Sequence, residues 1–219
     1  MAYGCENPSS LQIASSRDGT SWNSMSFPKK SLSLEDFELT SFKENLCLAY
    51  IDKGAIKLVF SKDGKSWTSE TDPCTLNAKR LSVTEFNDKL YLAYATTNQN
   101  GDIYVTCSDN GQDWSPSNGQ KTTWGTHDSL KLIPFKNKLI LAHIHTQGNS
   151  IEIGSSSDGK QWPLDTHFPT NLPRKQLSMQ PFKDELQITY DLNSNGNGPS
   201  TTQHMIKSTD GKKWVTSKL

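Results

Sequence analysis

Charged side chains occur in pairs at four matching positions along the chain, each at the start of an alternating run of apolar residues. The pairs are Glu35 and Asp36, Lys79 and Arg80, His127 and Asp128, and Arg174 and Lys175. Two carboxyl groups about 5 to 10 Å apart across a pocket can hydrolyse a glycosidic bond. Asp36 and Asp128 are therefore a candidate acid and base, although a rim that only contacts solvent would carry the same residues.

Stronger catalytic motifs are absent, because the sequence has no GxSxG, no HExxH and no glycine-rich loop of the phosphate-binding kind. We therefore predict that the chain is not an enzyme and has no catalytic residue and no cofactor. His143 and His145 share one face of a predicted strand and could bind a metal. His143, however, takes the repeat position held elsewhere by Tyr50, Tyr94 and Tyr190, so we expect a packed ring and no metal site.

Ligand-binding side chains are predicted in the loops of the rim that carries the charged pairs. Asn side chains can donate to and accept from sugar hydroxyls, but Asn is also a common turn former. Trp124 is the only one of the six Trp residues outside a repeated motif, and it could either stack on a sugar or cover the core. The predicted ligand-binding residues are Trp124, His127, Asp128, Asp36, Arg80, Arg174, Asn98, Asn100, Asn149, Asn193 and Asn195.

A seven-residue motif occurs five times, as SRDGTSW, SKDGKSW, SDNGQDW, SSDGKQW and STDGKKW. Its Gly allows a positive φ, and its Asp or Asn can accept hydrogen bonds from nearby backbone N–H groups. The Ser hydroxyl can add a second bond, and the Trp ring can pack beneath the turn. The motif thus predicts a structural hairpin turn made by Asp18, Trp22, Asp63, Trp67, Asn110, Trp114, Asp158, Trp162, Asp210 and Trp214.

The motif Trp residues recur every 45 to 52 residues, a spacing in the range of propeller blades. Alternating runs between them, such as LSVTEF, LYLAY and DIYVTC, predict antiparallel hairpins. We therefore predict an all-β fold, a five-bladed β-propeller of four-stranded antiparallel blades, as a single domain over 1–219. Its repeats would span about 1–30, 31–75, 76–122, 123–170 and 171–219.

The first repeat is incomplete, because only four full hairpins accompany the five motifs. Two explanations stay open. Residues 2–5 could form the second strand of a thin fifth blade, or the missing strand could come from an unusual closure or from a partner chain.

The motif SxDGxxW resembles the Asp box, also called the BNR repeat, of sialidase-type propellers, with one residue fewer than the usual SxDxGxxW. This resemblance implies a propeller fold in which the boxes are structural and lie away from the ligand. In size and blade number the chain is also similar to five-bladed propeller lectins of the tachylectin type. A sialidase would need three arginines around the substrate carboxylate, and of the three arginines present Arg17 lies inside a box.

The charge balance argues against some partners. Lys and Arg together number 23, as do Asp and Glu, so long-range attraction to nucleic acid or to an anionic membrane is not expected. No run of eighteen apolar residues and no signal-peptide pattern occurs, so we expect a soluble chain that is cytoplasmic or non-classically secreted.

The function favoured by these patterns is a carbohydrate-binding lectin. Several weak glycan sites on the loop face or between blades would gain avidity through multivalency. The alternatives are a protein–protein interaction scaffold and a glycoside hydrolase of sialidase-like fold. Glycans or glycoconjugates are the predicted partners, without nucleic acid or membrane insertion, and a homo-oligomer is left open.

Overall fold

The computed structural model describes residues 2–4, 11–27, 33–126, 128–147, 150–169, 177–193 and 201–218. Regular secondary structure in these residues is β-strand, and the strands form five antiparallel sheets. The alternating apolar runs of the sequence become these strands, since period-2 alternation lets each strand bury side chains on its faces. The all-β class and the β-propeller arrangement are confirmed.

Three of the sheets have four strands in chain order and are full blades. Each has short turns between its first and second strands and an SxDGxxW turn between its third and fourth. The strands are β7 (Ala78–Phe86), β8 (Lys89–Thr96), β9 (Asp102–Ser108), β10 (Trp114–Gly125), β11 (Leu130–Phe135), β12 (Lys138–Ile144), β13 (Ser150–Ser156), β14 (Leu164–Pro169), β15 (Leu177–Phe182), β16 (Glu185–Asn193), β17 (Thr201–Ser208) and β18 (Val215–Lys218).

A fourth blade has three strands, β4 (Leu34–Phe42), β5 (Asn45–Asp52) and β6 (Ala55–Ser61). A single bridge replaces its outer strand, because the backbones of Leu58 and Thr71 exchange two hydrogen bonds of 3.0 Å. The chain after the second motif also bonds β6 at Phe60, whose carbonyl oxygen accepts from the Thr68 N–H over 2.9 Å and whose N–H donates to Thr68 Oγ1 over 3.0 Å, but it forms no fourth strand among the described residues.

The N-terminal sheet contains β1 (Ala2–Gly4), β2 (Leu11–Ser15) and β3 (Asn23–Ser26). β1 pairs with β2, which leads into the first SxDGxxW turn, so residues 2–4 take the place of a second blade strand, in agreement with one of the two explanations above. The structure thus has four blades and a three-stranded N-terminal sheet. The prediction of five four-stranded blades is wrong in this respect, because residues that could supply the other strands do not pair as strands in the described part of the chain.

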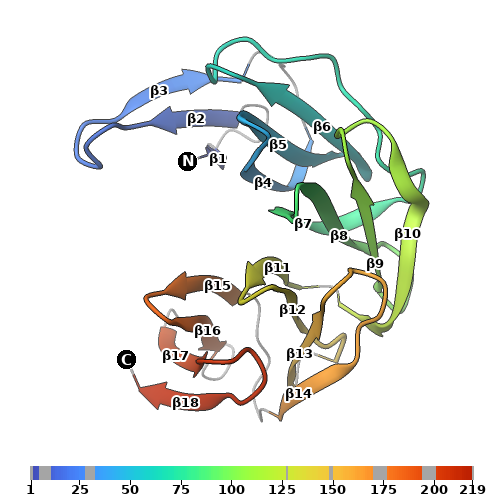
Figure 1. Ribbon diagram of the computed structural model, residues 1–219, viewed down its shortest axis with the longest axis vertical. Helices are drawn as coiled ribbons and strands as arrows, with labels where there is room; N and C mark the ends of the chain where they lie inside the picture. Colours follow the sequence, from blue (N-terminus) through green and yellow to red (C-terminus); the bar gives the residue numbers. More distant parts are fainter. Residues whose placement is uncertain are drawn as a thin grey trace.

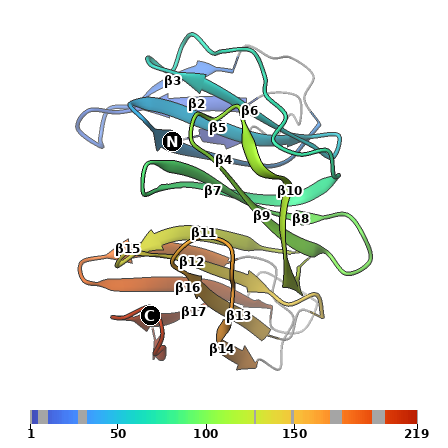
Figure 2. The same ribbon diagram turned by 45° about the vertical axis from the view of Figure 1, so that its right-hand side comes forward.

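The sheets follow one another around an arc, with the first strand of each blade toward the middle (Figure 1). These inner strands, β4, β7, β11 and β15, contact one another in that order. Figure 2 shows the sheets as successive layers. Four clusters of buried side chains fill the spaces between consecutive sheets, and one of them joins Leu11 and Ile13 of β2 to Leu48 and Tyr50 of β5. Apolar packing between blade faces therefore holds the arc together.

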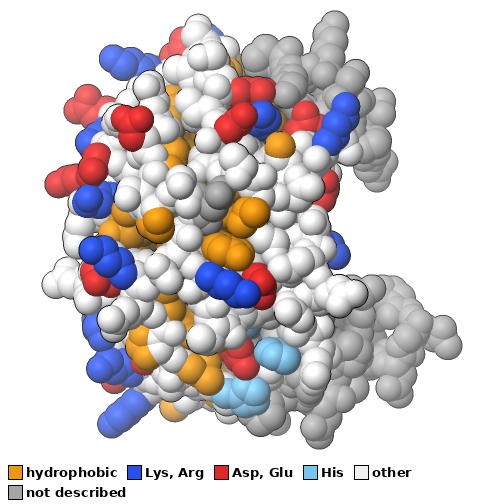
Figure 3. Space-filling view, turned by 90° about the vertical axis from the view of Figure 1, so that its right-hand side faces the viewer, with side chains coloured by type: hydrophobic (Ala, Val, Ile, Leu, Met, Phe, Trp, Pro, Cys, Tyr) orange, Lys and Arg blue, Asp and Glu red, His pale blue; other side chains and the backbone are white. Residues whose placement is uncertain are grey.

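The face shown in Figure 3 carries positive and negative side chains side by side, in keeping with the balanced composition. In the part of the chain that the structure describes, no helix is long and apolar enough to span a membrane.

Candidate functional site

The five SxDGxxW turns share one set of hydrogen bonds. In the second copy the Ser61 hydroxyl donates to Asp63 Oδ1 over 3.1 Å and accepts from the Gly64 N–H over 2.8 Å. Asp63 Oδ1 also accepts from the two N–H groups that follow Gly64, at 2.8 and 2.9 Å. In all five copies the Gly φ lies between 73° and 77°. The motif therefore closes each turn by local bonds alone.

The acidic groups of these turns are committed to backbone N–H groups. Hydrogen bonds from the Lys213 and Lys212 N–H groups lower the pKa of Asp210 to about 2. Similar backbone bonds lower the pKa of Asp63 and Asp158. Asn110 replaces Asp in the third copy and accepts the same kind of bonds, at 2.8 Å from each of two N–H groups. The side-chain oxygens of these residues bond the backbone of the turn, and a neutral amide can accept the same bonds.

The opposite rim, where the inner strands begin, holds a polar pocket of about 330 Å³. We call it the channel-mouth pocket, since the starts of inner strands β4, β7, β11 and β15 meet there. Four of the charged residues paired in the sequence come together in it. Its lining consists of Glu35, Asp36, Arg80, Asp128, Ser129, Leu130, Lys131 and Leu177.

Asp36 is an acidic group of this pocket that has lost much of its hydration. Its Oδ2 accepts a hydrogen bond from the Leu81 N–H and its Oδ1 one from the Phe37 N–H, each 3.0 Å long. Loss of hydration raises the pKa of Asp36, although these bonds and the charges of Lys131 and Arg80 oppose the rise. A carboxyl group in this setting can hold a proton at a pH where an exposed Asp cannot.

Glu38 lies two residues further along β4 and therefore on the same side of the strand. Its Oε2 accepts from the Val83 N–H at 3.1 Å, and its Oε1 lies 3.4 Å from Lys131 Nζ. Burial raises the pKa of Glu38, with Lys131 acting in the opposite direction. Sequence reasoning missed Glu38 and Lys131. The sequence could have indicated them, because Glu38, Ser82 and Lys131 hold the same position of the repeat. A polar residue therefore recurs at that position within an apolar strand.

Arg80 ties two blades together at the pocket. Its Nε donates to the Asp128 carbonyl oxygen over 2.6 Å, and its Nη1 donates to the Lys79 carbonyl oxygen over 2.8 Å. The Asp128 N–H in turn donates to Thr126 Oγ1 over 3.3 Å. The backbone of Asp128 is thus fixed from both sides, and its side chain lines the pocket.

Serine side chains make the same inter-blade bonds as the two acids. Ser82 Oγ accepts from the Leu132 N–H at 2.9 Å, and Ser129 Oγ accepts from the Leu177 N–H at 3.2 Å. A neutral hydroxyl is therefore sufficient to join neighbouring inner strands. Asp36 and Glu38 perform this role with groups that can also transfer a proton.

The other predicted ligand-binding residues are spread over the molecule. Trp124 is 7% exposed, and its ring lies 5.4 Å from that of His143, so its contacts fit the role of a cover on the core. Asn98 and Asn100 are exposed in the loop after β8, where Asn98 Nδ2 donates to Asp102 Oδ2 over 2.9 Å. Asn193 belongs to β16. His127, Asn149, Arg174 and Asn195 lie outside the described residues.

Solved structures with a similar fold include glycoside hydrolases. A variant of an exo-β-1,3-galactanase from Phanerochaete chrysosporium, solved with β-1,3-galactotriose, gives a TM-score of 0.64 at 11% identity over 94% of this chain and 54% of that chain. A family 43 α-L-arabinofuranosidase from Clostridium thermocellum gives 0.57 at 12% identity over 82% and 72%. A family 32 β-fructofuranosidase from Bombyx mori gives 0.57 at 11% identity over 85% and 49%.

At these identities the likeness establishes the fold. The chain spans about half the length of the galactanase. No protein-family model matches the sequence, and no curated protein matches it at a significant level. The relation of the SxDGxxW motif to Asp boxes therefore stays a resemblance.

Two predictions are corrected by this comparison. The chain was predicted to be a non-catalytic lectin and not an enzyme, whereas the propellers it resembles are glycoside hydrolases. The prediction against catalysis was based on the absence of a catalytic sequence motif. A pair of carboxyl groups has no such motif, because its members come from strands far apart in the sequence.

Proposed function

We propose that the chain is a glycoside hydrolase whose active site is the channel-mouth pocket. The observation that carries the proposal is a polar pocket that brings together two acidic side chains, Asp36 and Asp128, of which Asp36 loses hydration and bonds the neighbouring strand. Glycosidases divide acid and base work between two carboxyl groups held in different environments. The likeness to propeller glycosidases supports this assignment.

Asp36 is the proposed general acid. Protonated Asp36 would donate its proton to the glycosidic oxygen of a bound glycan, which makes the departing sugar a better leaving group. Its half-buried position on β4, against β7, favours the protonated form. The rate should therefore fall as pH rises through the raised pKa of Asp36, because the ionised carboxylate has no proton to give.

Asp128 is the proposed second carboxylate, acting as base or nucleophile. Arg80 is a positioning residue, since it holds the Asp128 backbone from the neighbouring blade. Glu35, exposed at the rim of the pocket, and Lys131 can bond sugar hydroxyls. Glycans are thus the proposed partners of this rim, while the resemblance to Asp boxes bears on the structural turns of the other rim.

The test is hydrolysis of a substrate panel suggested by the neighbouring folds. Purified protein would be incubated with aryl β-galactosides, aryl α-L-arabinofuranosides and sucrose, and the released aglycone or reducing sugar measured. We expect turnover of at least one substrate and a loss of about 10²- to 10⁴-fold in kcat for Asp128→Asn. Thermal unfolding of the variant would confirm that it is folded.

The absence of turnover by the unmodified protein on all three substrate classes would contradict the proposal. So would an Asp128→Asn variant with unchanged kcat. A matched control is Asp72→Asn, which removes a carboxylate paired with Lys57 at 2.7 Å on the outer surface and should leave the rate unaltered.

A further inference from the structure

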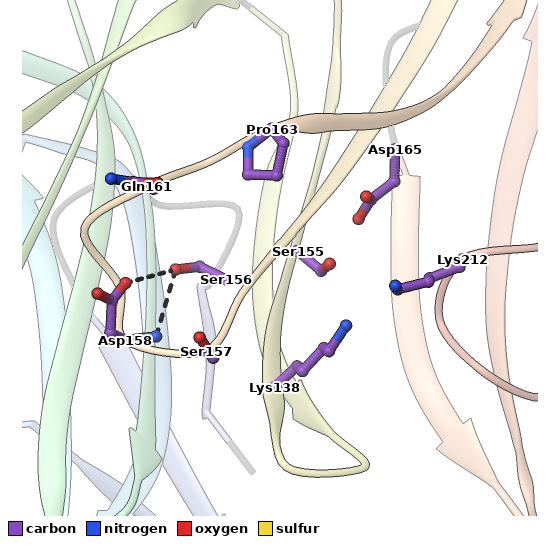
Figure 4. Close-up of a pocket in the computed structure, with 9 residues that line it drawn as sticks. All are labelled: Lys138, Ser155, Ser156, Ser157, Asp158, Gln161, Pro163, Asp165 and Lys212. Carbon is purple, nitrogen blue, oxygen red and sulfur yellow. Dashed lines mark hydrogen bonds between the residues drawn. The ribbon is translucent and has the colours of Figure 1, made fainter.

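A second polar pocket lies on the rim of the SxDGxxW turns, between the blade β11–β14 and the last blade. It has a volume of about 260 Å³. We call it the lysine pocket. Its lining consists of Lys138, Ser155, Ser156, Ser157, Asp158, Gln161, Pro163, Asp165 and Lys212 (Figure 4). It is separate from the channel-mouth pocket, because it contains turn residues and the start of β12, whereas that pocket contains the starts of inner strands.

Three charged side chains of this pocket have no charged partner among the described residues. Lys138, Lys212 and Asp165 point toward one another across the pocket, with the Ser155 side chain beside them (Figure 4). Asp165 Oδ2 is buried and has no hydrogen-bond partner in the described structure. No ion pair joins Asp165 to either lysine among the described residues. A buried carboxylate oxygen is costly when it accepts no hydrogen bond, so Asp165 Oδ2 can favourably accept one from a ligand.

The remaining acid of the lining does not neutralise the two lysines. Asp158 lies at the other end of the pocket in Figure 4, where its Oδ1 accepts from the Ser156 hydroxyl at 3.1 Å and from the Lys160 N–H at 2.9 Å. Both bonds belong to the turn. The end of the pocket near Lys138, Lys212 and Asp165 therefore presents two free ammonium groups and one free acceptor.

The preceding gap between blades contains an equivalent pocket that serves as an internal reference. Lys89 and Lys160 hold the repeat positions of Lys138 and Lys212 there, and both line that pocket. Lys89 Nζ, however, lies 3.0 Å from Asp109 Oδ1, and this hydrogen bond raises the pKa of Lys89.

The difference between the two pockets lies in two turn positions. Asp109 and Asp113 line the reference pocket, whereas Ser157 and Gln161 hold the same positions in the lysine pocket. The carboxylate that pairs with Lys89 thus has no counterpart beside Lys138. The repeat keeps the two lysines and replaces the acids at these two turn positions, so Lys138 and Lys212 have no ion-pair partner among the described residues and can pair with a ligand.

We propose that the lysine pocket binds a small anion that also carries hydroxyl groups, the chemistry of a sugar acid or another hydroxycarboxylate. The carboxylate of the ligand accepts charge-assisted hydrogen bonds from Lys138 and Lys212. A hydroxyl of the ligand donates to the unpaired Oδ2 of Asp165. Ser155 and Ser157 supply further hydroxyl groups at the wall. This site does not depend on the function proposed for the channel-mouth pocket.

The test is a calorimetric titration of the full chain with D-gluconate, acetate and D-glucose. Gluconate has both the carboxylate and the hydroxyl groups, acetate lacks the hydroxyl groups, and glucose lacks the charge. We expect saturable binding of gluconate, with acetate weaker by about tenfold or more and no measurable binding of glucose. Lys138→Gln and Lys212→Gln should each weaken gluconate binding by about tenfold or more.

Two further variants use the reference pocket. Ser157→Asp places a carboxylate where Asp109 lies in that pocket, so it should pair with Lys138 and weaken gluconate binding to the same degree. Lys89→Gln changes a lysine that is already paired and should leave the affinity unaltered. Failure of gluconate to bind, equal binding of acetate and gluconate, or an equal loss in Lys89→Gln would overturn the proposal. Melting curves of all variants would show that each is folded.

Discussion

The two rims of the propeller use the same residue types in opposite ways. On the turn rim, five copies of one motif make one set of local bonds, and the backbone lowers the pKa of Asp63. On the channel-mouth rim, equivalent repeat positions hold Asp36, Arg80 and Ser129, and burial raises the pKa of Asp36. The repeats thus share the same residue types in the turns that close the blades, and they carry different residues at the starts of the inner strands, where the channel-mouth pocket lies.

The largest effect on stability is expected where a turn glycine also meets the neighbouring blade. A Cβ at Gly111 would lie 2.4 Å from Phe60 Cζ, whereas a Cβ at Gly19 would meet nothing within 4 Å, and both residues have φ near +75°. Gly111→Ala should therefore cost about 3 kcal/mol of unfolding free energy and Gly19→Ala about 1 kcal/mol, measured by urea unfolding. Equal losses of unfolding free energy in the two variants would show that contact with the neighbouring blade does not constrain the turn at Gly111.

A smaller effect is expected from the acid of one turn. Asp63→Ala removes the acceptor of two backbone N–H groups and should cost about 1 kcal/mol. Asp63→Asn should cost only a few tenths of a kcal/mol, because an amide oxygen can accept the same bonds, as Asn110 does. Thermal melts of the two variants side by side would measure this, and an Asn variant as unstable as the Ala variant would mean that charge is required.

The smallest effect is a difference in pH dependence between the rims. The pKa of Asp210 is lowered to about 2 from an ordinary value of 3.8, so its contribution is present above pH 3.8 and is lost as pH falls toward 2. The pKa of Asp36 is raised, so its contribution is present below pH 3.8 and is lost as pH rises through the raised pKa.

Melting temperatures recorded against pH would separate the two contributions. The difference between the unmodified protein and Asp210→Asn should shrink as the solution is acidified. The melting temperature of the unmodified protein relative to Asp36→Asn should instead rise as the solution is acidified through the raised pKa of Asp36. If the melting temperatures of the two variants depended on pH in the same way, the proposed electrostatic difference between the rims would be contradicted.

The turns and strands could be predicted from the sequence because their determinants are local. The φ of Gly64 and the acceptor at Asp63 act within seven residues, and strand alternation acts within one hairpin. The isolated bridge between Leu58 and Thr71, which stands where a fourth strand was expected, was not predicted. Its position depends on the path of the loop over β6, which the sequence pattern does not reveal.

The site was only partly predictable for a related reason. Asp36, Arg80 and Asp128 were candidates because each belongs to a charged pair at the start of an inner strand, and the structure brings them into one pocket. Glu38 and Lys131 come from strands 93 residues apart in sequence and meet through the register of inner strands. The pKa shift of Asp36 also depends on its burial between blades, which no local pattern reveals.

The most direct test of the account compares one carboxyl group from each rim. The values of kcat/KM for Asp36→Asn and Asp63→Asn would be measured on the best substrate of the unmodified protein. The account predicts a fall of about 10²- to 10⁴-fold for Asp36→Asn and no appreciable change for Asp63→Asn, since only Asp36 is proposed to transfer a proton. Full activity in Asp36→Asn, or an equal loss in both variants, would contradict it.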